Sequence, residues 1–224
     1  MSENSPKKIN DIYKVKYYYP LKENKSIGEN INCLLLGNQG SGKTSFLKSL
    51  VGESISNIIS TIGKDKAYFN YSFEGKEHSF IIFDTTGQER YNSLTKNLFR
   101  FANAFLLFFD VTNEESFEKV QKWIGDIVDN KGNINEEYEL FLVANKIDEY
   151  EMRKIGKAQG KNLANKYNIK YFEISCLKKI NIYELLYEIT LMSYKKSEPI
   201  KRNKSIRLKK NKKDNNKKKK SLCC

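Results

Sequence analysis

Apolar residues recur along the chain with two different periods, and segments of the two kinds alternate. Short apolar runs typical of buried strands occur at Ile31–Leu36, Ala67–Phe73, Ser79–Phe83, Ala104–Asp110, Leu140–Ala144 and Tyr171–Ile174. Apolar residues three or four positions apart predict helices that begin near residue 44 and that cover 117–128 and 182–192. The segment 151–167 has a weaker helical pattern, because Gly156 and Gly160 interrupt it.

This alternation predicts an α/β fold, with a mostly parallel six-stranded sheet and helices on both faces. One strand is expected to be antiparallel. The runs 67–73 and 79–83 are separated only by Glu74-Gly75-Lys76-Glu77, a spacing typical of a hairpin.

Charge divides the chain into three parts. The net charge is +13, yet 14 Lys and Arg and only two acids lie from Lys195 to the end, so the preceding part is nearly neutral. We therefore expect a polar N-terminal extension at 1–28, one folded domain at 29–195 and a disordered polybasic tail at 196–224. A basic tail on a neutral domain weakens any assignment of the domain to nucleic-acid binding. For 1–28 we expect disorder; the alternative is a short segment docked on the domain.

Cysteines and apolar segments indicate the compartment. Two of the four cysteines end the chain, so no disulfide framework is expected. The first residues, MSENSPKK, lack the apolar core of a signal peptide, and no apolar run reaches the length of a membrane span. We expect a cytosolic chain, with any membrane attachment made from outside the bilayer.

A glycine-rich loop links the first strand and the first helix of the domain. It reads GNQGSGKT, which matches the P-loop pattern G-x-x-x-x-G-K-[ST]. Its backbone N–H groups are expected to converge on phosphate oxygens at a helix N-terminus, with Lys43 on the β- and γ-phosphates and the Thr44 hydroxyl on Mg²⁺. The expected nucleotide-binding residues are Gly37, Gln39, Gly40, Ser41, Gly42, Lys43, Thr44 and Ser45. The alternative is a chance glycine-rich turn, and the loop alone does not identify the base.

Polar residues directly after the strand 79–83 suggest phosphate chemistry. This stretch reads DTTGQE and begins at Asp84. Asp84 is expected to hold Mg²⁺ through water, Gly87 to bring its N–H close to a γ-phosphate, and Gln88 to orient an attacking water. The alternative is a polar turn with Asp84 as a helix N-cap.

Two further motifs predict the base. Asn145-Lys146-Ile147-Asp148 follows the strand 140–144, and the carboxylate of Asp148 is suited to accept both N1–H and N2–H₂ of guanine. Ser175-Cys176-Leu177 follows the last strand, where backbone N–H groups are expected to meet guanine O6. Asx-capped surface turns are the alternative. All four motifs follow strands, and in open α/β sheets ligands bind at that edge.

These motifs, together with Ile59–Gly63 (ISTIG), Phe109–Thr112 (FDVT) and a terminal Cys-Cys, make the region from about Asn30 to Tyr194 resemble a small GTPase of the Ras superfamily, most closely the Rab branch. The resemblance implies a single P-loop G domain that binds GTP, GDP and Mg²⁺ and switches conformation on hydrolysis. It implies that Thr61 contacts Mg²⁺ and the γ-phosphate, and that Lys43, Thr61 and Gln88 serve catalysis. Hydrolysis is expected to be slow without an activator.

The resemblance also implies partners and a location. Vesicle traffic at the cytoplasmic face of intracellular membranes is the expected setting, with cycling through the cytosol as a monomer. An exchange factor, a GTPase activator, effectors and a prenyl-binding chaperone are the expected partners. Cys223 and Cys224 resemble a doubly geranylgeranylated end rather than a C-a-a-X box, and the basic tail would add attraction to anionic lipid. The alternatives are two free thiols on an inert or nuclear-targeting tail.

Several positions depart from the Rab pattern. Effector identity cannot be carried over, because positions at or near the effector-facing surface read Lys64, Lys66, Phe83 and Leu98. Gln39 stands where relatives have a small residue, which predicts an altered response to an activator. Leu177 replaces the usual lysine, and no aromatic residue lies between Phe46 and Tyr68 to cover the guanine.

Two other functions compete with the switch. One is a GTP-binding scaffold that has lost hydrolysis, against which Gln88 and Thr61 argue. The other is a nuclear or RNA-binding protein that acts through its tail, for which salt-dependent RNA binding would be the sign. An ATP-dependent P-loop enzyme is disfavoured by Asp148 and its motif.

Overall fold

A computed structural model of the chain describes residues 15–18, 30–51, 66–73, 76–85, 98–132, 134 and 138–197. Its strands are β1 (Val15–Tyr18), β2 (Asn30–Gly37), β3 (Lys66–Phe73), β4 (Lys76–Asp84), β5 (Ala104–Asp110), β6 (Glu139–Asn145) and β7 (Lys170–Glu173). Its helices are α2 (Lys43–Val51), α5 (Glu114–Glu118), α6 (Val120–Lys131), α7 (Lys157–Lys166) and α8 (Ile182–Ser197), with a 3₁₀ turn η1 (Tyr150–Met152).

One sheet runs through the described part of the chain, in the order β1-β3-β4-β2-β5-β6-β7. The strands β4, β2, β5, β6 and β7 are parallel neighbours, whereas β3 is antiparallel to both β4 and β1. The α/β class is therefore confirmed. The described sheet has seven strands rather than the six expected, and β3 is the strand that opposes the others.

The additional strand, β1, comes from the N-terminal extension. It pairs with the outer edge of β3, from Val15 opposite Phe73 to Tyr18 opposite Asn70. The expectation of disorder is wrong for these four residues, and the alternative of a docked segment holds there. The physical reason is that valine and tyrosine favour strands and that an edge strand offers unpaired backbone groups to any extended segment.

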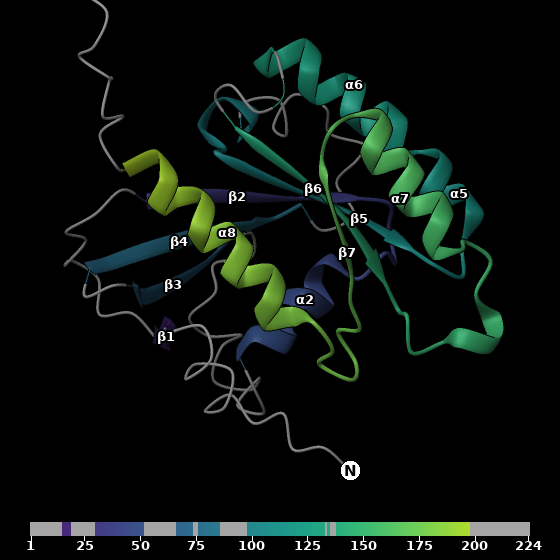
Figure 1. Ribbon diagram of the computed structural model, residues 1–224, viewed down its shortest axis with the longest axis horizontal. Helices are drawn as coiled ribbons and strands as arrows, with labels where there is room; N and C mark the ends of the chain where they lie inside the picture. Colours follow the sequence, from purple (N-terminus) through teal and green to yellow (C-terminus); the bar gives the residue numbers. More distant parts are fainter. Residues whose placement is uncertain are drawn as a thin grey trace, which may run out of the picture.

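Alternation along the central strands builds one hydrophobic core on each face of the sheet. In β2, Cys33 and Leu35 face a core formed with α2 and α8, whereas Leu34 and Leu36 face a core formed with α6 and α7. Figure 1 shows these two helical layers on opposite sides of the sheet. Strands buried on both faces are apolar throughout, which is why β5 and β6 appear in the sequence as unbroken apolar runs.

Helix boundaries follow local capping. Asn113 caps α5, because its side chain accepts a hydrogen bond from the backbone N–H of Ser116. The expected helix at 151–167 is shorter in the structure: α7 begins at Lys157, after Gly156, whose N–H donates to the Gln159 side chain over 2.7 Å. The glycine therefore marks the start of this helix and does not lie within it.

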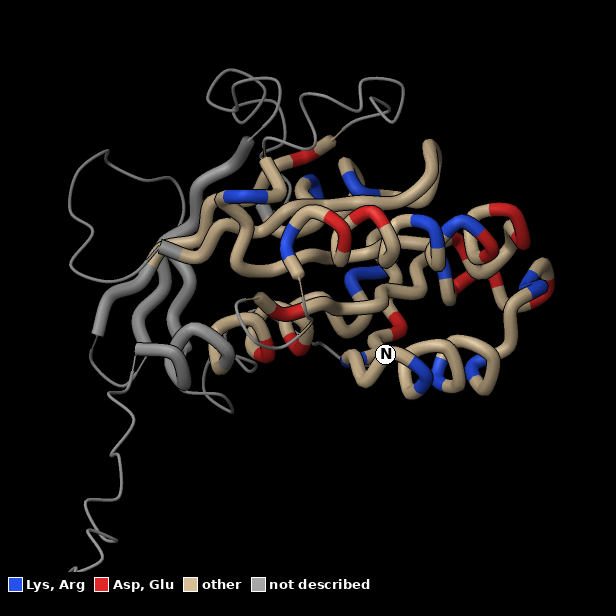
Figure 2. Tube along the Cα trace, turned by 90° about the horizontal axis from the view of Figure 1, so that it is seen from above, with Lys and Arg blue, Asp and Glu red and all other residues tan. Residues whose placement is uncertain are grey.

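Charged residues of both signs are interspersed along the outer helices and loops, while the central strands carry few (Figure 2). No helix among the described residues combines the length and apolar composition that a membrane span requires.

Candidate nucleotide-binding site

The glycine-rich loop connects the end of β2 to the start of α2, and two of its glycines are required by close approach. Gly37 has φ +135°, and a Cβ there would lie 2.2 Å from the carbonyl oxygen of Phe108 on the neighbouring strand β5. Gly42 has φ +98°, and a Cβ there would lie 1.9 Å from Nδ2 of Asn145. The two fixed glycines of the motif are thus the positions where any side chain collides.

Two hydrogen bonds within the loop hold its lysine in place. Lys43 Nζ donates to the carbonyl oxygens of Gly37 (2.6 Å) and Asn38 (2.9 Å), and the residue is only 5% exposed. Lys43 is also the first residue of α2, whose first N–H groups have no acceptor within the helix. An ammonium group and a helix N-terminus at one loop make an anion site.

The two described candidates for Mg²⁺ ligation lie together. Thr44 Oγ1 donates to Asp84 Oδ2 over 2.7 Å, which joins the start of α2 to the end of β4. A hydroxyl that donates its hydrogen to a carboxylate keeps lone pairs for a cation, and oxygen ligands are those that Mg²⁺ prefers. These residues therefore fit the metal.

Asn145 connects three of the motifs. Its Nδ2 donates to the carbonyl oxygen of Ser41 in the glycine-rich loop (3.0 Å), and its Oδ1 accepts from the N–H of Cys176 (3.2 Å). Asn145, with 2% of its surface exposed, therefore joins the glycine-rich loop to the loop after β7. A direct contact of Asn145 with nucleotide stays a prediction.

Asp148 carries a buried carboxylate oxygen, Oδ1, which has no hydrogen-bond partner among the described residues. A buried acceptor without a donor costs free energy of about 1–3 kcal/mol, and more when it is charged, so a donor from a ligand would relieve it. Guanine offers two adjacent donors, and the position of Asp148 in the cleft fits that edge of the base.

Asp110 holds Lys146 in place. From the sequence, Asp110 was placed in the FDVT motif but was not assigned to the site. Its Nζ forms an ion pair with Asp110 Oδ2 at 2.5 Å, and the other oxygen of Asp110 accepts from the N–H and hydroxyl of Thr112. Lys146 has φ +66°, an uncommon conformation for lysine. Asp110 therefore fixes the orientation of Lys146. The pairing of Asp110 with Asn145 across β5 and β6 was the available signal, and it depends on strand register.

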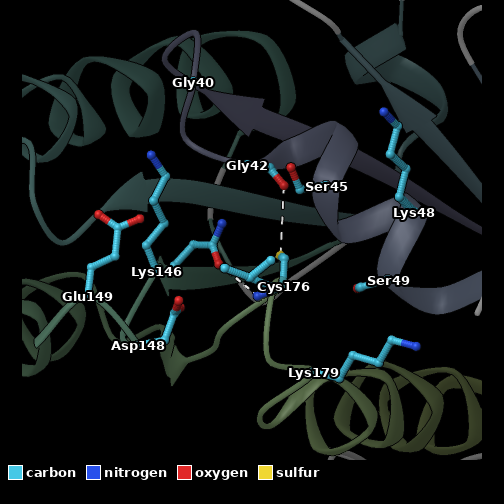
Figure 3. Close-up of a pocket in the computed structure, with 12 residues that line it drawn as sticks. Gly40, Gly42, Ser45, Lys48, Ser49, Lys146, Asp148, Glu149, Cys176 and Lys179 are labelled. Carbon is cyan, nitrogen blue, oxygen red and sulfur yellow. Dashed lines mark hydrogen bonds between the residues drawn. The ribbon is translucent and has the colours of Figure 1, made fainter.

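A cleft of about 590 Å³ lies between these motifs. Its lining residues are Gly40, Gly42, Ser45, Lys48, Ser49, Asn145, Lys146, Asp148, Glu149, Cys176, Leu177 and Lys179. Figure 3 shows Lys146 and Glu149 at one end, and Lys48 and Lys179 at the other. Sequence reasoning missed Lys48, Ser49, Glu149 and Lys179, because helix and loop neighbours of a motif carry no pattern of their own.

The loop after β7 supplies the remaining wall. Cys176 is buried, and burial, together with the nearby charge of Asp148, raises the pKa of its thiol to about 12 although a hydrogen bond to Asn145 opposes the rise. Ser175 is buried beneath it and bonds to Ile180 through both backbone groups. Leu177 stands at the rim, 76% exposed.

The described structure brings together the expected residues of the glycine-rich loop, Asp84, the 145–148 motif and the 175–177 loop. Gln39 is described and exposed. It is not among the residues that line the cleft, and neither are Gly37, Ser41, Lys43, Thr44 and Asp84. The remaining predicted residues, Thr61, Gly87, Gln88, Cys223 and Cys224, lie outside the described residues, as do Lys64 and residues 198–224.

Fold and site together define a P-loop domain with the glycine-rich loop at one end of a cleft and, at the other, a carboxylate with a buried oxygen that has no hydrogen-bond partner among the described residues. Comparison with known proteins agrees: the model of the Ras family matches residues 32–195. The chain is 35% identical to Ras-related protein Rab-15 of Rattus norvegicus over 167 residues, which cover 73% of this chain and 77% of that protein. It is 34% identical to Ras-related protein SEC4 of Candida albicans over 160 residues (71% and 75%). It is 36% identical to Ras-related protein Rab-13 of Bos taurus over 152 residues (67% and 73%).

The chain therefore belongs to the Ras family, within its Rab-type small GTPases. It is a GTP-hydrolysing enzyme that binds guanine nucleotide and regulates vesicle traffic.

Proposed function

We propose that the cleft holds GTP or GDP with its phosphates on the glycine-rich loop and its base against Asp148, and that the residues at each end act as follows. The buried, unpartnered Oδ1 of Asp148 is the observation that carries this proposal. It stands in the same cleft as Gly42 and Ser45 of the phosphate loop, so one elongated ligand reaches both ends.

At the phosphate end, Lys43 leaves or shares its two carbonyl acceptors to bind the β- and γ-phosphates. The loop N–H groups and the start of α2 bind the remaining oxygens. Both contributions are held in place by the loop itself, because Lys43 is already hydrogen-bonded to Gly37 and Asn38. Once Lys43 has reached the phosphates, the charge that spreads over the γ-phosphate during hydrolysis is stabilised by groups that are already in place.

Thr44, Asp84 and Thr61 would hold Mg²⁺, Thr44 and Thr61 through their hydroxyls and Asp84 through its carboxylate. When bound, this ion neutralises phosphate charge. The hydrogen bond between Thr44 Oγ1 and Asp84 Oδ2 holds these two oxygens together, at the start of α2 and the end of β4. Gln88 orients the water that attacks the γ-phosphate, and Gly87 offers its N–H to that phosphate.

At the base end, Asp148 accepts from N1–H and N2–H₂, and the N–H groups of Cys176 and Leu177 lie near O6. The stem of Lys146, fixed by its ion pair with Asp110, supports one face of the base. Adenine lacks the pair of adjacent donors and would leave a buried carboxylate without partners, so the site excludes it.

Outside the cleft, Cys223 and Cys224 carry geranylgeranyl groups, and the basic tail adds about 1 kcal/mol for each Lys or Arg near an anionic surface. The protein then acts at the cytoplasmic face of intracellular membranes and cycles through the cytosol. An exchange factor, a GTPase activator, effectors and a prenyl-binding chaperone act on it.

The experiment is to denature the purified full-length protein and identify the nucleotide released. We expect guanine nucleotide from the native chain and from Glu149→Gln, and none from Asp148→Ala. Glu149 is the matched control, because it lines the same cleft one residue further along. Adenine nucleotide, or equal loss from both variants, would refute the role of Asp148.

A further inference from the structure

Glu173, the last residue of β7, lies outside the cleft and carries an unusual number of partners. Its carboxylate pairs with the guanidinium of Arg153, accepts from the hydroxyl of Tyr171 over 2.8 Å and lies 3.7 Å from Nζ of Lys157. The side chain is only 12% exposed. An ion pair that is mostly buried and has further hydrogen bonds holds its geometry far better than an exposed pair.

The protonation state of this carboxyl agrees with that geometry. Burial by itself raises the pKa of Glu173, yet hydrogen bonds from Arg153 and Tyr171 and the charges of Arg153 and Lys157 hold it below its usual range. The carboxylate is therefore charged at neutral pH.

Arg153 connects Glu173 to the loop that contains Asp148. Arg153 follows η1, the turn directly after the Asp148 motif, and its Nε also donates to the carbonyl oxygen of Ile155 over 2.7 Å. The same segment is anchored from the other side, because the N–H groups of Lys154 and Ile155 both donate to Val111 at 2.9 Å. The loop after Asp148 is thus held between the end of β5 and β7.

The backbone of Glu173 is hydrogen-bonded to the second of the two base-reading loops, by which we mean the loop with Asp148 and the loop 174–181 with Cys176. Its carbonyl oxygen accepts from Nδ2 of Asn181 over 2.8 Å, which closes the loop that begins at Ile174. Within that loop Ser175 and Ile180 exchange backbone hydrogen bonds at 3.2 and 3.0 Å, and Cys176 donates to Asn145. Glu173 therefore joins the roots of both loops that form the base end of the cleft.

We propose that Glu173 is a positioning residue that clamps these two loops together and so sharpens recognition of the 2-amino group of guanine and slows nucleotide release. The proposal rests on the proposed function, since it assigns to Glu173 an action through Asp148 and Cys176. The cluster lies on β7 and on the segment 153–157, whereas Lys43, Thr44 and Asp84 belong to α2 and to the end of β4. Hydrolysis of nucleotide that is already bound is therefore expected to be independent of it.

The test uses full-length protein loaded with GDP or with inosine diphosphate, which lacks the 2-amino group, and measures both dissociation rates. In Glu173→Gln we expect GDP to dissociate about tenfold faster. A tenfold change corresponds to about 1.4 kcal/mol, close to the lower end of the range for one hydrogen bond to a charged group. Inosine diphosphate should change less, so the difference between the two nucleotides narrows. The single-turnover rate of GTP hydrolysis should stay as in the native chain.

Glu188→Gln is the matched control. It removes the ion pair between Glu188 and Lys170 (2.9 Å), at the other end of β7. In the described part of the chain, no side-chain hydrogen bond or ion pair joins either residue to the loops that contain Asp148 and Cys176. We expect both dissociation rates to be unchanged in this variant. Tyr171→Phe removes one hydrogen bond to Glu173 and keeps the ion pair, so a smaller acceleration is expected, and this variant serves if Glu173→Gln does not fold.

Unchanged GDP dissociation in Glu173→Gln would overturn the clamp, and so would an equal acceleration of both nucleotides, which a merely looser fold would produce. If the native chain does not distinguish GDP from inosine diphosphate, the role of Asp148 in the proposed function fails instead. The two failures are therefore separate results.

Discussion

Asp148→Asn replaces one of the two carboxylate acceptors with an amide donor while it keeps the size of the side chain. Guanine presents two donors to this position, N1–H and N2–H₂. In the variant one of them meets Nδ2, which also donates, so one hydrogen bond becomes a repulsive contact and the other loses its charge. Xanthine has a carbonyl oxygen where guanine has the 2-amino group, and it therefore matches the amide.

The magnitude follows from the burial of Oδ1, which leaves water unable to replace a lost partner. Each hydrogen bond to a charged group is worth about 1.5–3 kcal/mol, so two of them amount to about 3–6 kcal/mol, or about 10²- to 10⁴-fold in affinity. We expect Asp148→Asn to lose GDP affinity by that factor and to bind xanthosine diphosphate in preference.

Equilibrium competition between GDP and xanthosine diphosphate on the full-length protein measures both effects. Glu149→Gln provides the control, because it makes the same chemical change at the neighbouring residue of the same cleft and should keep the preference for GDP. If Asp148→Asn still prefers GDP, Asp148 does not read the base and the argument from its unpartnered oxygen is wrong.

Three further changes test other parts of the site. Gly42→Ala should lower the free energy of unfolding by about 2–4 kcal/mol, because it combines a positive φ with a collision, whereas Gly40→Ala has only the positive φ and meets no atom within 4 Å. Equal losses on thermal unfolding would contradict this. Asp110→Asn should speed GDP dissociation, because it releases Lys146 from its ion pair. If the ion pair causes this effect, the double variant Asp110→Asn, Lys146→Met should release GDP no faster than Lys146→Met alone. Cys176 should react slowly with iodoacetamide at pH 8, and the reaction rate should rise about tenfold per pH unit up to about pH 10. The reason is that only the thiolate reacts and that the pKa of the Cys176 thiol is about 12. Peptide mass spectrometry measures the rate, and a plateau near pH 8.5 would argue against a buried thiol.

Residues of the candidate site were predictable wherever a short local pattern carries the chemistry. Gly37 and Gly42 are an example, because each glycine of the motif stands where the structure leaves no room for a Cβ. Asp148 is another, since its position after a buried strand already places it at the ligand edge of the sheet. Such residues can be predicted because the motif and the strand before it are adjacent in the sequence.

Residues that act across long sequence distances were not predictable in this way. Asp110 ends β5 and Lys146 directly follows β6, and only the register of β5 with β6 brings the two residues together. Glu173 was likewise invisible, because its partner Arg153 belongs to a turn without periodicity. Propensity and period describe neighbours along the chain, whereas ion pairs of this kind depend on tertiary packing.

The N-terminal strand was missed for a different reason. Four residues are too few for a period, and the lysines around them resemble those of a disordered segment. What orders them is the edge of β3, which lies far along the chain. The predicted roles of Thr61, Gly87 and Gln88 stay predictions.

During synthesis, β1 leaves the ribosome long before the strand that it needs. The strand β2 follows it directly but pairs with β4 and β5, so β1 has no partner until β3 emerges from Lys66 onward. At about 5–20 residues per second, that wait lasts seconds. By then β3 has β4 as a hairpin partner close in sequence, and local pairs form fastest. The strand β1 therefore pairs only seconds after it is made. Because its pairing with β3 is four residues long, its amide hydrogens should be among the first in the described sheet to exchange.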